Sequence, residues 1–473
     1  MQTFKFLRPG ALLACCALLL LAVACKDDDD SNASANNRHV NDWILTNMQD
    51  WYLWNDELPT NTNKNLAPDE YFSSLLYDGD RFSWIQDNYL ELLNSLQGIS
   101  KEAGYEYALY RESNTNNNVI AQILYIKPSS PAKNAGLKRG DVITHINNTQ
   151  ITISNYQTLL SALSENHTLT YRAMDVENES LSDPATVSLT PQEYHENPNY
   201  LHAVIETGEH KIGYYVYNFF ASGQSDGNEY DTEMESIING FKTAGITDLV
   251  LDLRFNSGGS EVSALNLASL LGADVNNTKV FMTKEYNDDI EQQILNEPGL
   301  GEDILTVNFT DKAANVGNLL QNKRLFILTG SRTASASELI INGLRPYMDV
   351  FLVGDTTYGK NVGSTSLYDD TDATNTWGMQ PIVVKVYNSL NQSDYDGGFY
   401  PNIVDPDNDF ILYPFGDARE PLLAKAIGQI TGSGTIGRTG LVDRPLVAHS
   451  LDRKKRSFQL TVDDRAVRAL NRP

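Results

Sequence analysis

The chain has 473 residues, of which 41% are hydrophobic, and a net charge of −25 at pH 7. So acidic a chain argues against nucleic acid or anionic lipid headgroups as its main partner. Its three cysteines, Cys15, Cys16 and Cys25, all lie in the first 25 residues, so the remainder offers no disulfide framework, no cysteine zinc site and no cysteine nucleophile.

Residues 1–25 predict a lipoprotein signal peptide. Lys5 and Arg8 precede an apolar stretch, residues 11–24, that is shorter than the ~20 residues needed to span a bilayer. The stretch ends in Leu-Ala-Val-Ala-Cys, which resembles a bacterial lipobox, although an ordinary cleavage site beside a cysteine is the alternative. The resemblance implies a lipid on Cys25 as the membrane contact, and a location in the cell envelope, at the outer membrane on its periplasmic or surface side.

Residues 26–37 predict a flexible tether, because a Lys-Asp-Asp-Asp-Asp run followed by Ser, Asn and Ala has little apolar surface to bury. The acidic run also resembles the surface-export signal of Bacteroidetes lipoproteins. Residues 38–97 then predict a helical region, since Ile44, Met48 and Trp51 recur with helical spacing. We interpret its tryptophans as core of this region rather than as a ligand cage.

Residues 98–190 change to strand character, with β-type runs at 119–126 and 141–146. Between these runs, Pro131 begins a short helix, Gly136 ends it, and the next turn enters a strand. This stretch, with a helix expected at 155–163, resembles the PDZ signature. The resemblance implies that a peptide C-terminus is added as a strand, with its carboxylate held near Gly98 and Ile99, where the usual loop pattern is missing.

Residues 195–430 alternate between strands and helices, which predicts a layered α/β domain. The buried strands are expected at 249–253, 325–328 and 350–353, and the helices at 233–242, 264–271 and 336–344. Residues 431–473 are rich in Gly and Arg and predict a frayed C-terminal tail.

A Ser-His-Asp triad in the α/β region would need a histidine from another domain, which is possible but uncommon. None of the seven histidines lies between residues 211 and 448, and the chain has neither a G-x-S-x-G nor an H-E-x-x-H motif. Asp405, Asp407 and Asp409 begin like a calcium loop but lack its glycine and its final glutamate. We therefore expect no metal and no cofactor.

A serine nucleophile activated by a lysine remains possible, and the groups that it requires lie on three loops, each at the end of a strand. Ser331, Ser335 and Ser337 follow the strand at 325–328, where a helix N-terminus offers free amides, although an N-cap with a Ser-x-x-Glu box is the simpler explanation. Lys360 follows the strand at 350–353, and a glycine pair, residues 258–259, follows the strand at 249–253.

These three segments resemble the C-terminal processing, or tail-specific, serine peptidase family. The specific signals are the Thr-Ala-Ser-Ala-Ser-Glu run, residues 333–338, and the Gly-Lys pair that ends at residue 360. The resemblance implies a Clp/crotonase-like α/β fold, polypeptide substrates with accessible C-termini, Ser335 as nucleophile and Lys360 as base. It further implies oxyanion amides from Ala336 and from Gly258 or Gly259.

One position departs from that family. Many members carry a glutamine four residues after the lysine, where it orients the amine, and this chain has Ser364. Either Ser364 or another group replaces it, or the chain is a weak or inactive peptidase that binds peptides. As a base, Lys360 must be neutral near pH 7, which requires a dry pocket that lowers its pKa by ~3 units from 10.4.

Overall fold

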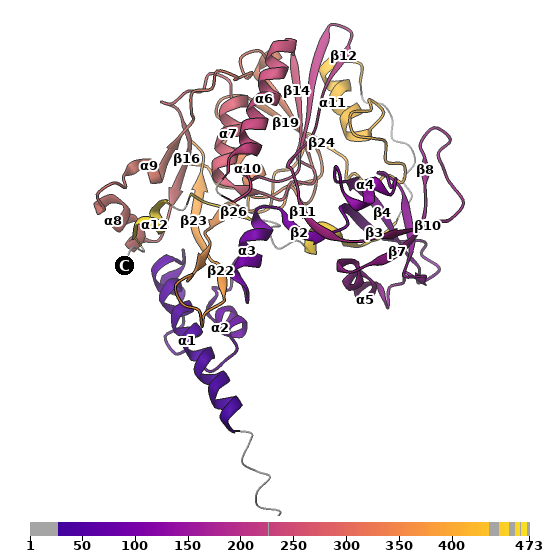
Figure 1. Ribbon diagram of the computed structural model, residues 1–473. Coiled ribbons are helices and arrows are strands. Elements are labelled where there is room, and N and C mark those ends of the chain that lie inside the picture. Colours follow the sequence, from indigo (N-terminus) through magenta and orange to yellow (C-terminus); the bar gives the residue numbers. More distant parts are fainter. Residues whose placement is uncertain (1–26, 226, 435–443, 454–458, 464, 471–473) are drawn as a thin grey trace, which may run out of the picture.

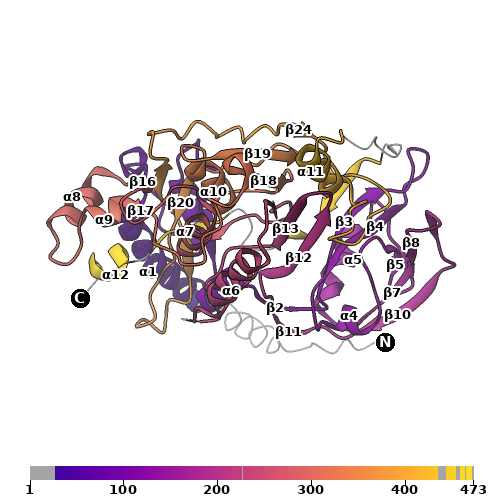
Figure 2. The ribbon, with the colours of Figure 1, turned by 90° about the horizontal axis from the view of Figure 1, so that it is seen from above.

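The computed structural model describes residues 27–225, 227–434, 444–453, 459–463 and 465–470. A layered α/β domain lies at the top of Figure 1, with the N-terminal helices below it and the PDZ-like domain to its right. Seen from above, the PDZ-like domain lies at one end of the molecule, and helices α8, α9 and α12 lie at the other (Figure 2). Among the described residues, none of the helices is both long and apolar enough to cross a membrane.

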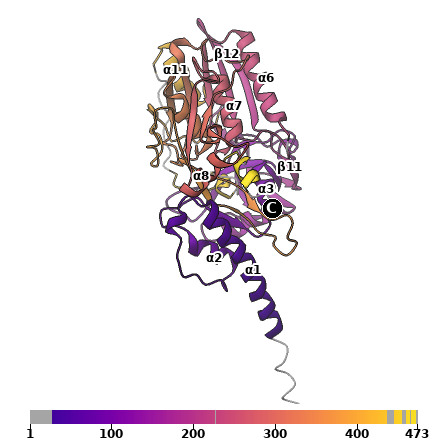
Figure 3. The same cartoon turned by 90° about the vertical axis from the view of Figure 1, so that its left-hand side faces the viewer.

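The N-terminal region is built mainly from helices, as its spacing predicts. Ile44, Met48 and Trp51 are each at most 1% exposed and belong to the same hydrophobic core as the α/β domain. Residues 27–37, expected as a tether, instead form the start of the first helix, which projects downward in Figure 3. The elements are α1 (Asp27–Trp51), η1 (Asn55–Glu57), α2 (Pro68–Leu75), β1 (Trp84–Gln86) and α3 (Tyr89–Leu96).

The PDZ-like domain is a sheet in the order β10-β7-β5-β4-β3-β25, with β6 paired to β5 and a separate pair formed by β2 and β11. Its last strand, β25, comes from the C-terminal part of the chain. The elements are β2 (Ile99–Glu102), β3 (Tyr105–Arg111), β4 (Val119–Ile126), α4 (Pro131–Asn134), β5 (Val142–Ile146), β6 (Thr149–Gln150), α5 (Tyr156–Ser161), η2 (Ala162–Ser164), β7 (His167–Arg172), β8 (Met174–Asp175), β9 (Ser180–Leu181), β10 (Ala185–Leu189) and β11 (Gln192–His195).

The α/β domain is centred on a sheet in the order β12-β13-β14-β18-β19-β24, parallel from β13 onward. Alternate residues of β14 face opposite sides: Leu249 and Leu251 join the core formed with α6, α7 and α10, whereas Val250 packs against α11. The elements are β12 (Asn199–Thr207), β13 (His210–Tyr217), α6 (Glu229–Ala244), β14 (Asp248–Asp252), α7 (Glu261–Leu271), η3 (Gln321–Lys323), β18 (Arg324–Thr329), α10 (Ala336–Leu344), β19 (Asp349–Gly354), β24 (Ile403–Val404) and α11 (Pro421–Thr431).

A second sheet, in the order β15-β26-β20-β23-β16-β17, joins this domain to the N-terminal helices, and β1 continues into a smaller sheet with β22 and β21. The elements are β15 (Gly259–Ser260), β16 (Val280–Glu285), α8 (Asp288–Asn296), α9 (Glu302–Leu305), β17 (Thr306–Asn308), β20 (Val362–Ser364), β21 (Leu367–Tyr368), β22 (Gly378–Gln380) and β23 (Ile382–Tyr387).

The described part of residues 431–473 contradicts the expectation of a frayed tail. Leu460, Val462 and Ala466 are each at most 4% exposed and lie in the main core, a long-range contact that local composition does not reveal. The elements are β25 (Leu446–His449), η4 (Ser450–Arg453), β26 (Leu460–Thr461) and α12 (Arg465–Leu470).

Because the N-terminal helices share the core of the α/β domain, we expect the two to unfold together. Ile44→Ala should lower the free energy of unfolding by about 2–5 kcal/mol, through lost burial and a residual cavity. Denaturant unfolding followed by circular dichroism measures this, with Leu390→Ala, at a side chain 63% exposed, as the matched control. A change below about 0.5 kcal/mol for Ile44→Ala would contradict a shared core.

Candidate active site

The three loops singled out in the sequence follow three adjacent parallel strands. Strand β14 pairs with β18, which pairs with β19, so the three carboxyl ends meet at one edge of the central sheet. Functional groups in such α/β sheets gather at this edge because the strands hold the loops rigidly. The fold therefore brings Ser335, Lys360 and the glycine pair to one place.

Ser335 has the geometry of a nucleophile rather than of a simple helix cap. It directly precedes α10 with φ 61° and ψ −113°, a strained conformation for a residue with a side chain. The Ser-x-x-Glu capping box that the sequence offered as the simpler explanation is present, with Glu338 accepting from Ser335 N–H at 2.8 Å. The buried Ser335 Oγ itself has no hydrogen-bond partner of normal geometry within the part of the chain that the structure describes. By contrast, Ser337 Oγ donates to the carbonyl of Asn256 at 3.0 Å, and Ser331 is exposed.

The carboxylate of Glu338 joins the nucleophile turn to the lysine loop. Its oxygens accept hydrogen bonds from the backbone N–H groups of Ser335 and Lys360, each at 2.8 Å. They also accept from the N–H of Gly359 at 2.7 Å and from Thr357 Oγ1 at 2.6 Å. Burial raises the pKa of Glu338 to about 7, against the opposing effect of these donors.

Lys360 lies in the dry pocket that a base requires. Its side chain is fully buried, and this burial lowers the pKa of Lys360 to about 7, with the nearby charges of Asp80 and Glu338 acting in the opposite direction. Its Nζ lies 5.0 Å from the ring centre of Phe82 and donates to Gln459 Oε1 at 3.5 Å. Near neutral pH a large fraction of this amine is therefore unprotonated.

The N–H groups of the two glycines have different acceptors. Gly258 N–H donates to Asn256 Oδ1 at 3.0 Å, whereas Gly259 N–H donates to the backbone carbonyl of Gln459 at 2.5 Å. A Cβ on Gly258 would lie only 2.7 Å from the Cβ of Ser335, which places this turn against the nucleophile.

Of the three expected oxyanion donors, Ala336 therefore fits best, and Gly259 fits only once the Gln459 carbonyl leaves its N–H. As the first residue of α10, Ala336 has an N–H without an intrahelical acceptor. The N–H of Gly258, in contrast, is already used by Asn256.

Among the described residues, Ser364 is linked to Lys360 through Gln459. Its Oγ lies 3.1 Å from Gln459 Oε1 and 3.3 Å from the carbonyl oxygen of Leu460, so its single proton is donated to one of these or shared between them. Gln459, 99 residues after Lys360, thus brings an amide oxygen to the lysine. No sequence pattern pointed to Gln459, because this residue lies in the segment expected to fray.

A buried ion network supports the turn that carries the glycine pair. Arg254 Nε donates to Asp252 at 3.0 Å, and its Nη2 donates to Glu420 at 2.9 Å. Two of the three aspartates that resembled a calcium loop are counter-ions, Asp407 to Arg254 and Asp405 to Lys425. Within the described residues, no group of three or more His, Cys, Asp or Glu side chains could hold a metal ion.

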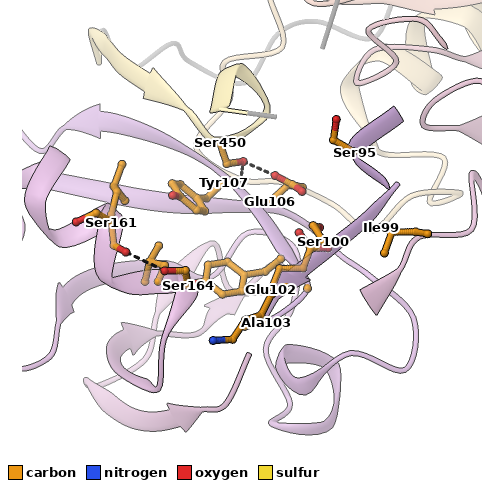
Figure 4. A pocket seen from close by; sticks show the side chains of 15 residues that line it. Ser95, Ile99, Ser100, Glu102, Ala103, Glu106, Tyr107, Ser161, Ser164 and Ser450 are labelled. Carbon is orange, nitrogen blue, oxygen red and sulfur yellow. Dashed lines mark hydrogen bonds between the residues drawn. The ribbon is translucent and has the colours of Figure 1, made fainter. Parts of the chain in front are cut away.

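The PDZ-like domain contains a pocket of about 420 Å³ between the start of β3 and helix α5 (Figure 4). Ile99, expected near the peptide carboxylate, lines this pocket, and Gly98 precedes it with φ +77°. Ala103, Gly104 and Tyr105, which lead into β3, also line it. The sequence analysis placed the peptide carboxylate near Gly98 and Ile99 and did not single out the residues that lead into β3.

A buried serine at a helix N-terminus, a desolvated lysine and a glycine turn packed against the serine together define a serine hydrolase suited to acyl transfer. Comparison with known families identifies the class further: residues 211–403 match Peptidase family S41, residues 39–84 the Peptidase S41 N-terminal domain, and residues 122–172 a PDZ domain. The chain belongs to peptidase family S41 and is a serine peptidase.

Individual relatives agree with this assignment. The chain is 25% identical over 367 residues to a carboxyl-terminal-processing protease of Picosynechococcus, covering 76% of this chain and 78% of the relative. It is 24% identical to the chloroplastic carboxyl-terminal-processing peptidase 1 of Arabidopsis thaliana, over 60% of this chain and 52% of that one. A crystal structure from Bacteroides fragilis, assigned to the S41 proteases, matches with TM-score 0.68 and 26% identity, covering 83% of this chain and 97% of that one. The expected family and fold class are thus confirmed.

The pKa values predict that peptidase activity rises with pH. Lys360 becomes neutral, and Glu338 becomes a full hydrogen-bond acceptor, as pH increases through about 7. We expect kcat/KM to increase about tenfold between pH ~6 and pH ~8 and then level off. Hydrolysis of fluorescent casein at constant ionic strength measures this, with circular dichroism confirming a folded chain throughout. A profile that is flat, or that rises only near pH ~10, would contradict a desolvated lysine base.

Proposed function

We propose that this chain is a serine endopeptidase of the C-terminal processing type that uses Ser335 as nucleophile and Lys360 as base. The observation that carries the proposal is the burial of Lys360 beside the nucleophile turn, with a pKa of about 7. Glu338 holds the backbones of the two residues together, so the loop that carries the amine lies next to the turn that carries the hydroxyl, which supports the proposed pair.

The chemistry proceeds in two acyl transfers. Ser335 Oγ attacks the substrate carbonyl, its proton passes to neutral Lys360 Nζ, and the resulting oxyanion accepts hydrogen bonds from the N–H groups of Gly259 and Ala336. Collapse of this intermediate breaks the C–N bond, and the protonated lysine returns the proton to the departing amine. Water, deprotonated by the same lysine, then attacks the ester, releases the new carboxyl terminus and restores Ser335.

The PDZ domain supports the recruitment of polypeptides with accessible C-termini. In this mode of recognition an extended peptide pairs with an exposed strand, and a neighbouring pocket receives its end. Strand β3 is the edge of the domain's own strands, and the pocket beside Ala103, Gly104 and Tyr105 opens at its beginning. The substrate is therefore held by backbone contacts that tolerate many sequences.

Two substitutions test the Ser–Lys mechanism. Ser335→Ala and Lys360→Met should each lower kcat/KM on casein by about 10³-fold or more, because each removes an essential group. Ser337→Ala is the matched control and should retain most activity, since its hydroxyl bonds a carbonyl of the scaffold. A serine-directed phosphonate probe should label Ser335, as read by peptide mass spectrometry. A folded wild-type chain without turnover on any unfolded protein would favour the alternative, a peptide-binding lipoprotein.

We further propose that Cys25 carries a lipid that anchors the peptidase in the cell envelope, at the outer membrane. Cys25 lies outside the residues that the structure describes, and support comes from the lipobox-like sequence before it. Metabolic labelling with a palmitate analogue should mark the wild type and not Cys25→Ala, with Cys16→Ala as the matched control. Equal labelling of wild type and Cys25→Ala would contradict the anchor.

A further inference from the structure

The C-terminal part of the chain occupies the peptide-binding edge of the PDZ domain. Strand β25 pairs antiparallel with β3, and Arg111 N–H donates to the carbonyl of Pro445 at 3.1 Å. At the far end of the pairing, Ser450 Oγ accepts from Tyr107 N–H at 2.9 Å and donates to Glu106 at 2.6 Å, as Figure 4 shows. This is the strand addition by which such domains bind peptides.

The side chains of β25 pack on the PDZ-like domain as those of a bound peptide would. Val447 and Ala448 pack on the same hydrophobic core as Tyr156 and Leu159 of α5. Beyond Ser450 the chain turns away through η4, and Ser450 lines the pocket that remains at the end of the groove. The edge of β3 is thus covered by an internal segment of this chain.

The same segment continues to the nucleophile loop. Asp452 in η4 accepts two hydrogen bonds from Arg332, at 2.7 and 2.8 Å, three residues before Ser335. This fork-to-fork pairing is the strongest kind of side-chain ion pair, although its carboxylate is partly exposed. It links η4 to the loop that carries the nucleophile.

The segment then reaches the oxyanion amide. The carbonyl of Gln459 accepts from Gly259 N–H at 2.5 Å, and the next residues form β26, parallel to both β15 and β20. A Cβ built on Gly258 would lie 2.3 Å from this carbonyl oxygen and 2.7 Å from Ser335 Cβ, so the oxygen lies close to the nucleophile. The carbonyl of a bound substrate needs the same N–H.

We propose that residues 444–453 together with 459–463, here called the C-terminal strap, are a built-in ligand that an extended polypeptide substrate must displace. The inference rests on the proposed peptidase function and adds its regulation, because the strap covers both the recruitment edge and the oxyanion amide, two places that one extended substrate must occupy. Leu460 and Val462 anchor the strap in the main core, so its release means local opening around Gln459 and β25, not unfolding of β26.

Tethering makes this competition effective. A ligand on the same chain acts at an effective concentration of about millimolar, so weakly bound polypeptides cannot displace it. Segments that pair with β3 over its full length, or that also fill the open pocket, gain contacts that the strap does not make. The strap therefore selects for substrates that engage the PDZ domain and the active site together.

The test weakens the strap without altering its core residues or the catalytic groups. Ser450→Ala combined with Asp452→Ala removes its contacts to Tyr107, Glu106 and Arg332. We expect a fluorescein-labelled peptide of residues 444–453, added in trans, to bind the double variant at least about tenfold more tightly than the wild type by fluorescence anisotropy. We expect kcat/KM on casein to rise by a similar factor.

The matched control is Ser188→Ala combined with Asp183→Ala, the same substitutions at exposed positions of the PDZ domain away from β3. It should change neither readout. If the double variant does not fold, Asp452→Asn alone, at a carboxylate 44% exposed, serves as the test and should move both readouts in the same direction. The single substitution thus separates release of the strap from a folding defect of the double variant.

The two readouts separate this inference from the proposed function. Tighter peptide binding without turnover in any variant would support the strap and contradict the peptidase mechanism. Peptidase activity with unchanged peptide binding and unchanged kcat/KM would overturn the strap. A fall in kcat/KM in the double variant would also overturn it, because the segment would then be part of the working site.

Discussion

The hydrogen bonds to the carboxylate of Glu338 are the interaction on which the site depends. A carboxylate this deeply buried is stable only when donors surround it, and four of them come from two loops that follow different strands. Three of these donors are backbone N–H groups, so the carboxylate fixes main-chain positions and not only side chains. The spacing between the turn of Ser335 and the loop of Lys360 is set in this way.

Burial of Lys360 places a second demand on the fold. Lowering the pKa from 10.5 to about 7 means that the ammonium form is destabilised by about 5 kcal/mol relative to water. The pocket stays dry because the N-terminal region covers it, with the ring of Phe82 facing Nζ. That region shares the core of the α/β domain, so the energy of this large core offsets the cost of the buried amine.

The C-terminal strap uses strand pairing at both functional sites. At β3 it satisfies an open sheet edge, which otherwise exposes unpaired backbone groups, and at β15 it satisfies an amide beside the nucleophile. Both are also contacts that an extended substrate would make. While the strap occupies the edge of β3 and the amide of Gly259, other polypeptides cannot pair with them. In the proposed regulation, activity therefore depends on competition between substrate and strap for the same backbone hydrogen bonds.

The sequence alone determined the features that local patterns encode. Alternating apolar runs predicted the α/β domain, the absence of histidine between residues 211 and 448 removed a histidine triad, and family resemblance selected Ser335 and Lys360. The tertiary structure decided what depends on distant partners: Glu338 as the joint between two loops, Gln459 beside a lysine 99 residues earlier, and an ordered strap in place of a frayed tail. Composition describes how a segment behaves by itself, whereas residues 444–470 are ordered by strand edges and a core that other parts of the chain provide.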